Sequence, residues 1–282
     1  MFRFVSILAL AVLSLNPGPA PCQEASKDSI QAAADALRAG NAEAAAEIST
    51  RLLDRLSDPD PSALWIRAHA RELLEDYAGA LEDLRRLVQI EEPQPRTLVA
   101  LGEAAFKAAH MAASIAAFDA AVEAEDRIGP HLWQRGISAY YAERFEDGAR
   151  QFEVHRTVNP QDVENSVWHF LCVAAVEGFE TARSGLIPVD SDSRVPMAQV
   201  FDLFRGTGSV EQVLEAAARA RASGQRGSAD LYAHLYLGLY YEARGEAMLS
   251  AREIDKAVRT RQPRHYMWQV ARIHQQMRTR ER

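Results

Sequence analysis

The stretch Leu132-Trp133-Gln134-Arg135-Gly136 decides the fold, because two related stretches precede it at one constant interval. These are Leu98-Val99-Ala100-Leu101-Gly102 and Leu64-Trp65-Ile66-Arg67-Ala68. Each begins with leucine and ends with a small residue. Two further series keep the same interval, one small (Ala80, Ser114, Gly148) and one large and apolar (Leu84, Phe118, Phe152). A fixed period of about 34 residues indicates a repeat architecture.

The residue types explain the period. Two antiparallel helices can approach closely only where small side chains stand at their crossing, and a large apolar side chain then fills the space beside it. The composition also favours helix, because alanine is abundant and β-branched residues are sparse. One helix pair cannot bury both of its apolar faces, so at least about three pairs must stack. The sequence therefore predicts an all-α array of antiparallel helix pairs.

The pattern resembles the tetratricopeptide repeat, which has Gly or Ala eighth, Ala twentieth and an aromatic residue twenty-fourth. Three units match it, at 61–94, 95–128 and 129–162. Arg71 stands where the family usually has Tyr, and Gly148 where it has Ala. A degenerate unit before them extends the array to 26–162, and residues 231–282 supply a further repeat with a C-terminal capping helix. The resemblance implies a right-handed superhelix.

Residues 163–230 interrupt the period and predict an irregular helical segment. Turn-forming residues fill 184–196, and Ser209 with Gln212 has the spacing of a capping box. The run Asp190-Ser191-Asp192-Ser193 alternates acids as a calcium loop does, but it lacks the glycine and the distal glutamate of such a loop. We therefore expect a capped, solvated loop here.

The order of these parts resembles the NlpI family of bacterial envelope lipoproteins. The matching residues are Trp168 with Leu171, the segment 206–211, and the run from His234 to Gly245. Members of that family have N-terminal repeats, a Trp-containing helix, an irregular middle and a final repeat. The resemblance implies an adaptor that brings cell-wall hydrolases to a protease, and it implies a homodimer.

The N-terminus predicts export. Arg3 precedes an apolar run that ends at Leu15, and helix-breaking residues follow, as in a secretory signal peptide of residues 1–25. We expect a periplasmic or cell-envelope location. Cys22 raises the alternative of a lipid anchor, although Pro19 and Pro21 depart from the usual lipidation pattern. Cleavage after Cys22 is the other interpretation.

The charge is unevenly distributed. The chain of 282 residues carries a net charge of −7, which argues against a binder of nucleic acid or of other polyanions. Residues 256–282 nevertheless contain eight basic residues against Glu281 alone. This basic end is interpreted either as a solvated face or as a contact for an acidic partner or anionic lipid. Contact with a membrane is expected only through it or through a lipidated Cys22.

Residues that could carry chemistry do not form a recognisable catalytic or metal-binding motif. The chain has no glycine-rich phosphate loop, nucleophile elbow or zinc motif, and His265 and His274 fall on different helical faces. Cys172 lies in an apolar run and is expected to be a buried structural thiol. We expect that the protein is not an enzyme and that it binds neither a cofactor nor a metal ion. A hydrolase or lipid carrier using residues 184–208 is the weakest alternative, because no nucleophile–base pair is visible there.

The concave surface is the remaining candidate site. In a repeat superhelix the first helix of each pair lines the groove, and its inward positions here carry an aromatic strip with scattered charges. The predicted partner-binding residues are Trp65, His69, Glu103, Phe106, Trp133, Ile137 and Tyr140. The alternative for Trp65 and Trp133 is packing against a neighbouring repeat. The main hypothesis is an exported adaptor that binds a peptide or helix of a protein partner. The rival is a structural envelope protein that binds anionic lipid or polymer through its basic C-terminal helix.

Overall fold

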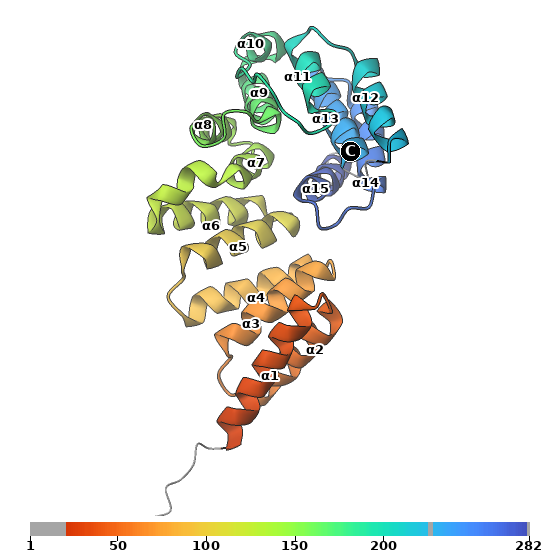
Figure 1. Cartoon of the computed structure of the whole chain (residues 1–282). Coiled ribbons are helices and arrows are strands. Elements are labelled where there is room, and N and C mark those ends of the chain that lie inside the picture. Colours follow the sequence, from red (N-terminus) through yellow and green to blue (C-terminus); the bar gives the residue numbers. More distant parts are fainter. Residues whose placement is uncertain (1–20, 225–227, 281–282) are drawn as a thin grey trace, which may run out of the picture.

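The computed structural model describes residues 21–224 and 228–280, and within these ranges the chain is built of helices and turns, without a strand. Figure 1 shows that consecutive helices pack as antiparallel pairs and that the pairs stack into a curved array. The first four pairs are α1 (Pro21–Arg38) with α2 (Ala42–Arg55), α3 (Pro61–Leu73) with α4 (Tyr77–Ile90), α5 (Pro95–Lys107) with α6 (Met111–Ala124), and α7 (Trp133–Tyr141) with α8 (Phe145–His155). A short 3-10 helix, η1 (Asp126–His131), joins α6 to α7. The predicted all-α repeat fold is confirmed.

Small residues stand at the helix crossings, as the repeat period predicts. A Cβ atom added at Gly136 would lie 2.6 Å from the Phe152 ring, and one at Gly102 would lie 3.0 Å from the Phe118 ring. Both phenylalanines are buried. Gly148 replaces the usual alanine because a Cβ there would lie 2.7 Å from the Cys172 sulfur.

The turns inside the pairs repeat the same geometry. Glu75, Ala109 and Glu143 are separated by one repeat period each, and all three have a positive φ of about 60°. The residue after each donates its backbone N–H to a carbonyl five residues earlier, for example His110 to Ala105 at 2.8 Å. This bond satisfies carbonyls at the end of the first helix. Arg71, in place of the usual tyrosine, ties such a turn to the second helix by donating to the Gly79 carbonyl oxygen at 3.0 Å.

The irregular segment forms the top of the curve in Figure 1. It contains α9 (Val163–Glu177), α10 (Phe179–Ser184), α11 (Met197–Arg205) and α12 (Val210–Ala222). The capping box of Ser209 and Gln212 is present at the start of α12. Residues 185–196 run without helix from α10 to α11. Their path brings Asp192 and Arg194 to the start of α9.

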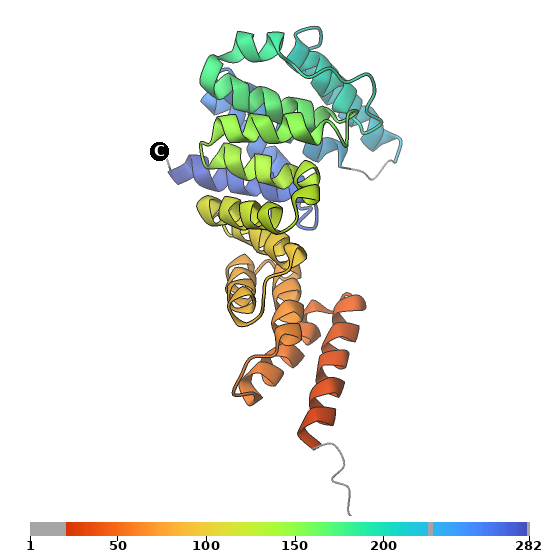
Figure 2. The ribbon, with the colours of Figure 1, turned by 90° about the vertical axis from the view of Figure 1, so that its left-hand side faces the viewer.

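The C-terminal helices turn back toward the repeats. The pair α13 (Ala229–Ala243) and α14 (Ala247–Arg259) is followed by α15 (Tyr266–Arg280). Figures 1 and 2 both place α15 on the inner side of the curve, beside α5 and α7. Contacts over long sequence distances hold it there: Gln269 donates to the Tyr77 hydroxyl at 2.6 Å, and the Tyr141 hydroxyl bonds His274 at 3.1 Å. The chain therefore closes part of its own groove.

The predicted signal peptide lies mostly outside the described residues, which begin with Pro21 at the start of α1. Cys22 falls within α1, and the predicted lipidation of its thiol lies outside the described side chains. Across residues 21–224 and 228–280, no helix combines the length and the hydropathy that a bilayer crossing requires.

Candidate functional site

Trp65 and His69 lie toward the open N-terminal part of the array. Their rings are 4.3 Å apart between centroids, and the His69 Nδ1–H donates to the Trp65 carbonyl oxygen at 2.8 Å. The Arg96 guanidinium stands 5.5 Å from the Trp65 ring centroid. Trp65 also packs against the hydrophobic core of the first repeats, and it is only partly buried. It therefore packs against its neighbours and is partly exposed as well.

Phe106, Ile137 and Tyr140 are buried in the protein's own core, which corrects the expectation that they face an open groove. The physical reason is the return of the C-terminal helices. Phe106 stacks on Tyr266 of α15 with 5.6 Å between centroids, and the Tyr140 hydroxyl donates to Glu242 of α13 at 3.2 Å. In this conformation no partner can reach these three side chains.

Glu103 and Trp133 line cavities that remain between the repeats and α15. Glu103 accepts a hydrogen bond from Gln134 at 3.0 Å, and burial raises the pKa of its carboxyl despite the nearby Lys107 ammonium. The Trp133 ring meets the Tyr266 ring edge to face, with 4.8 Å between centroids and 81° between planes. Glu103 thus contacts Gln134, the neighbour of Trp133 in α7, and Trp133 contacts Tyr266 of α15.

The first cavity has a volume of about 320 Å³ and is called the acidic-aromatic cavity below. Its walls come from α7, α8, the start of α9, the stretch before α11, α13 and the start of α15. They are formed by aromatic, acidic and amide side chains, with one arginine, one histidine and one methionine: Trp133, Phe152, Asn159, Asp162, Glu164, Asn165, Trp168, Arg194, Tyr232, His265, Tyr266 and Met267.

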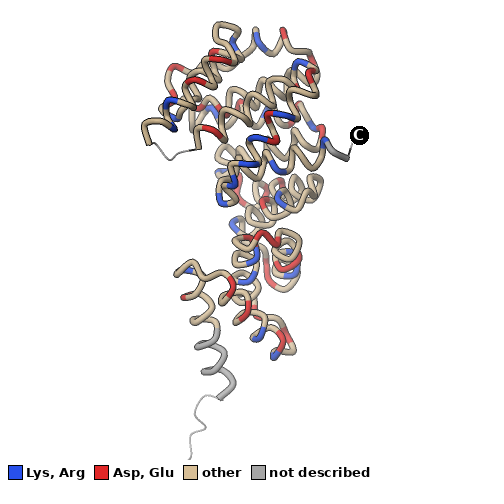
Figure 3. The backbone as a smooth tube through the Cα atoms, turned by 90° about the vertical axis from the view of Figure 1, so that its right-hand side faces the viewer, with Lys and Arg blue, Asp and Glu red and all other residues tan. Residues whose placement is uncertain are grey.

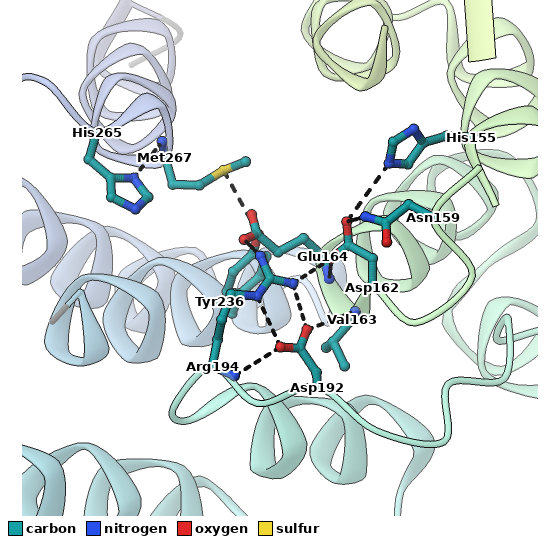
Figure 4. A network of polar contacts seen from close by, with 10 residues as sticks. All are labelled: His155, Asn159, Asp162, Val163, Glu164, Asp192, Arg194, Tyr236, His265 and Met267. Carbon is teal, nitrogen blue, oxygen red and sulfur yellow. Dashed lines mark hydrogen bonds and ion pairs between the residues drawn. The ribbon is translucent and has the colours of Figure 1, made fainter. Parts of the chain in front are cut away.

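Arg194 is the centre of the polar network in this cavity (Figure 4). Its Nη2 donates to Asp162 and to Asp192, both at 2.5 Å, its Nη1 donates to Glu164, and its Nε donates to Asp192 at 2.9 Å. The guanidinium also lies 5.8 Å from the Tyr232 ring centroid. All three of its nitrogens are therefore engaged within the chain.

Glu164 is buried beside this arginine. Its Oε2 accepts a hydrogen bond from the Tyr236 hydroxyl at 2.7 Å, and its Oε1 accepts from Arg194. Burial raises the pKa of the Glu164 carboxyl to about 7, although the positive charge of Arg194 opposes the shift. Asp162 behaves in the opposite way: burial raises the pKa of its carboxyl, but hydrogen bonds from His155 and Arg194 outweigh this and leave it lowered.

Three polar atoms of the cavity residues have no hydrogen-bond partner within the described part of the chain. They are the indole Nε1 of Trp168, the side-chain Oδ1 of Asn165 and the hydroxyl of Tyr266. Trp168 and Asn165 are 1% and 4% exposed, so water does not reach them freely. An unpaired buried polar atom costs about 1–3 kcal/mol, so these three atoms lower the stability of the cavity walls.

A second cavity, of about 280 Å³, lies on the other side of Tyr266. It is lined by α3, α4 and α5 on one side, including Leu73 and Glu103, and by the start of α15 on the other, including Gln269. Residues 262–265, which border a further hollow, connect the two regions. We call the whole depression along residues 262–269 the concave trough.

The trough is suited to binding rather than to covalent chemistry. Both oxygens of Glu164 are already engaged, and Cys172, whose thiol pKa is raised by burial, lies outside the lining of both cavities. Among the residues that the structure describes, no group of three or more His, Cys, Asp or Glu side chains is placed to hold a metal ion.

The sequence interpretation missed most of this cavity. The acidic run that was expected to be solvated contributes Asp192, whose side chain is only 4% exposed and accepts the Val163 backbone N–H at 3.2 Å. That expectation was wrong at Asp192, because the run caps α9 and holds Arg194. The sequence feature that could have revealed this contact is Arg194, which follows the alternating acids of residues 190–193. Tyr232 and Tyr266 do not belong to any series of residues that recurs with the repeat period, so the period could not identify them.

Comparison with known proteins supports the fold. No family model and no curated protein matches the chain. Among solved structures, a tetratricopeptide repeat protein from Parabacteroides merdae is similar, with a TM-score of 0.56 and 12% identity over 89% of this chain and 98% of that one. PilF of Pseudomonas aeruginosa gives a TM-score of 0.46 at 14% identity over 90% and 99% of the two chains. The fold is thus that of tetratricopeptide repeat proteins, and the finer resemblance to the NlpI family stays a prediction.

Proposed function

We propose that this chain is an exported adaptor that binds protein partners along its concave trough and holds them in the cell envelope. The observation that carries the proposal is the trough itself. It contains two cavities that share Tyr266 in their walls, and aromatic and acidic side chains line them. A repeat array with such a surface suits an extended peptide or a helix, because aromatic anchors in partly closed pockets dominate protein binding.

The repeats provide the rigidity that binding needs. Each pair is fixed by tight crossings such as Gly136 against Phe152, so the trough wall does not have to be ordered when a partner arrives. The N-terminal pairs α1–α4 are free of the returning C-terminal helices in Figure 1, apart from the contacts of Tyr77. Trp65 and His69 therefore extend the proposed surface beyond the closed part.

The partner assignment can be tested by site-specific photo-crosslinking in the full chain. A photo-reactive amino acid is placed at Asn159, at the rim of the acidic-aromatic cavity, and at Leu73, which is 39% exposed in the second cavity. Glu82 and Glu123, exposed on second helices of their pairs, are the matched controls. We expect specific protein adducts from the two trough positions only. Adducts of equal yield from the controls, or none from the trough, would refute the assignment.

Export is tested separately, on the N-terminus. The apolar run after Arg3 supports removal of a signal peptide near residue 25, with or without a lipid on Cys22. Mass spectrometry of the mature chain from fractionated cells distinguishes the outcomes. A truncated N-terminus in the envelope fraction supports export. A cytosolic chain that still begins at Met1 contradicts it.

The rival role for the basic C-terminal helix gains no support from its contacts. Arg272 lies over the Tyr77 ring at 4.5 Å and donates to the Lys107 carbonyl oxygen, and Arg278 pairs with Glu242 at 2.5 Å. Figure 3 shows acidic residues among the basic ones over this part of the molecule. Arg272 thus helps to hold α15 against the repeats, and Arg278 helps to hold it against α13. Binding of anionic lipid stays a prediction without a structural observation in its favour.

A further inference from the structure

We propose that the acidic-aromatic cavity binds a cationic nitrogen group, an alkylammonium or a guanidinium, which a lysine or arginine side chain of a protein partner supplies. The inference deepens the adaptor function and rests on it for the source of the group. Four features of the cavity carry it: its aromatic walls, its balance of charge, the engagement of Arg194 by three carboxyl groups and its size.

The aromatic walls favour a cation. Trp133 and Tyr266 meet nearly at a right angle, at 81°, and so form a corner of two rings. Trp168 and Tyr232 line the same cavity. A positive charge is attracted to the faces of such rings, and tryptophan gives the strongest attraction. The chain itself contains an example, since the Arg194 guanidinium lies 5.8 Å from the Tyr232 ring centroid.

The charges favour a cation as well. Asp162, Asp192 and Glu164 surround Arg194, so carboxyl groups outnumber the single guanidinium. His265 adds little positive charge, because burial and the nearby Arg194 lower the pKa of its imidazole. A further cation in the cavity would improve this balance.

Four of the five N–H groups of Arg194 already donate to carboxylates of the chain, which leaves one, on Nη1, for an anionic ligand. Its Nε, Nη1 and Nη2 all donate to carboxylates of the chain. A carboxylate or phosphate at that position would lie beside the carboxyl groups of Asp162, Asp192 and Glu164. Repulsion between like charges at such distances excludes it.

The dimensions suit one long side chain. The volume of about 320 Å³ is at the lower end of the range for ligand pockets. Exposed Asn159 stands at the rim, whereas Trp168, Asn165 and Glu164 are buried. Asp162 and Glu164, which line the cavity, carry the carboxyl groups that would face the N–H groups of the cation.

The test measures binding of short blocked peptides to the full mature chain by calorimetry and by tryptophan fluorescence. The peptides are alike except for one central residue, which is lysine, arginine, norleucine or glutamate. We expect the lysine and arginine peptides to bind at least ~10-fold more tightly than the norleucine peptide, as for a partly desolvated cation on aromatic rings. Equal binding of norleucine, preference for glutamate, or no binding of any peptide would overturn the proposal. This comparison needs no variant.

Two variants and a free amine sharpen the test. Glu164→Gln keeps the shape but removes a negative charge, and we expect it to weaken the lysine peptide ~5- to 10-fold relative to norleucine. Glu82→Gln, on the outer face, is the isosteric control and should leave binding unchanged. Butylammonium is the small-molecule arm: if it binds as tightly as the lysine peptide, a free amine is the ligand and the protein source is wrong. Crosslinks from Asn159 without any lysine preference would refute this inference and leave the adaptor function intact.

The pH dependence provides an independent readout. A bound cation favours the ionised form of Glu164, so the affinity should rise ~10-fold from pH 6 to pH 8, as the carboxyl with a pKa of about 7 ionises. The groups facing it are Asp162, Asp192, Arg194, Tyr232, Tyr236, His155 and His265. Among these, His155 also loses charge as pH rises, which acts in the same direction. Glu164→Gln should remove most of the rise.

Discussion

Raising the pH from 5 to 8 should destabilise the protein through Glu164. Burial raises the pKa of this carboxyl from 4.5 to about 7 in the folded state. A raised carboxyl pKa means that the folded state prefers the protonated form. The stability that this preference contributes is fully present below pH 4.5 and is lost as the pH rises through 7.

The magnitude follows from the shift. One pKa unit corresponds to about 1.4 kcal/mol, so ionising Glu164 in the folded protein costs about 3 kcal/mol, most of it between pH 5 and pH 8. Glu164→Gln cannot ionise but still offers an oxygen to the Tyr236 hydroxyl. The free energy of unfolding of the variant should therefore gain about 2–3 kcal/mol relative to the wild type over this interval.

The assay is urea unfolding followed by circular dichroism at pH 5, 6, 7 and 8, with both proteins compared at each pH. Subtracting the variant removes the contributions of the histidines that titrate in the same range. Asp147→Asn is the control: hydrogen bonds from Arg144 and Arg150 lower the pKa of the Asp147 carboxyl below its usual value, so the difference between this variant and the wild type should be flat above pH 5. If the free energies of unfolding of wild type and Glu164→Gln change with pH in parallel, ionising Glu164 in the folded protein costs little free energy. That result would refute the argument from its burial.

Three further predictions concern the repeat framework. Gly136→Ala should lower the free energy of unfolding by about 1–3 kcal/mol, because its Cβ would meet the Phe152 ring at 2.6 Å; Gly185→Ala, with its nearest neighbour 3.7 Å away, should be close to neutral in the same denaturation experiment. Ala109→Gly should raise the free energy of unfolding by about 0.5–1 kcal/mol, since glycine relieves the positive φ of 62°; an unchanged or lower value contradicts this. The Cys172 thiol should react with a thiol reagent only at the rate of unfolding, because it is 0% exposed, and rapid labelling of the native chain would show an unexpected opening.

The repeat framework was predictable because its determinants are local and periodic. Gly102 and Gly136 had to be small for two neighbouring helices to cross, and that requirement recurs in every unit. The capping box of Ser209 and Gln212 is likewise a contact between residues close together in the sequence. Such signals depend on spacing along the chain and are readable without knowledge of distant contacts.

The candidate site was predictable only in part. Trp133 and Glu103 do line cavities, but Phe106, Ile137 and Tyr140 are buried, and the chain's own C-terminal helices contact Phe106 and Tyr140. The groove positions follow from helical periodicity, whereas their exposure depends on what packs against them. No rule of spacing along one helix contains that information.

The sequence by itself determined the all-helical repeat pairs, their turns and the small residues at their crossings, since each of these depends on neighbours within a single repeat period. Only the tertiary structure decided where α15 lies, because that depends on single contacts such as Gln269 with Tyr77, which are 192 residues apart. The path of residues 185–196 placed Arg194 among Asp162, Glu164 and Asp192, and the return of α15 completed the walls of the acidic-aromatic cavity beside them. Contacts between residues so far apart follow no repeat, and their side chains become neighbours only when the superhelix closes.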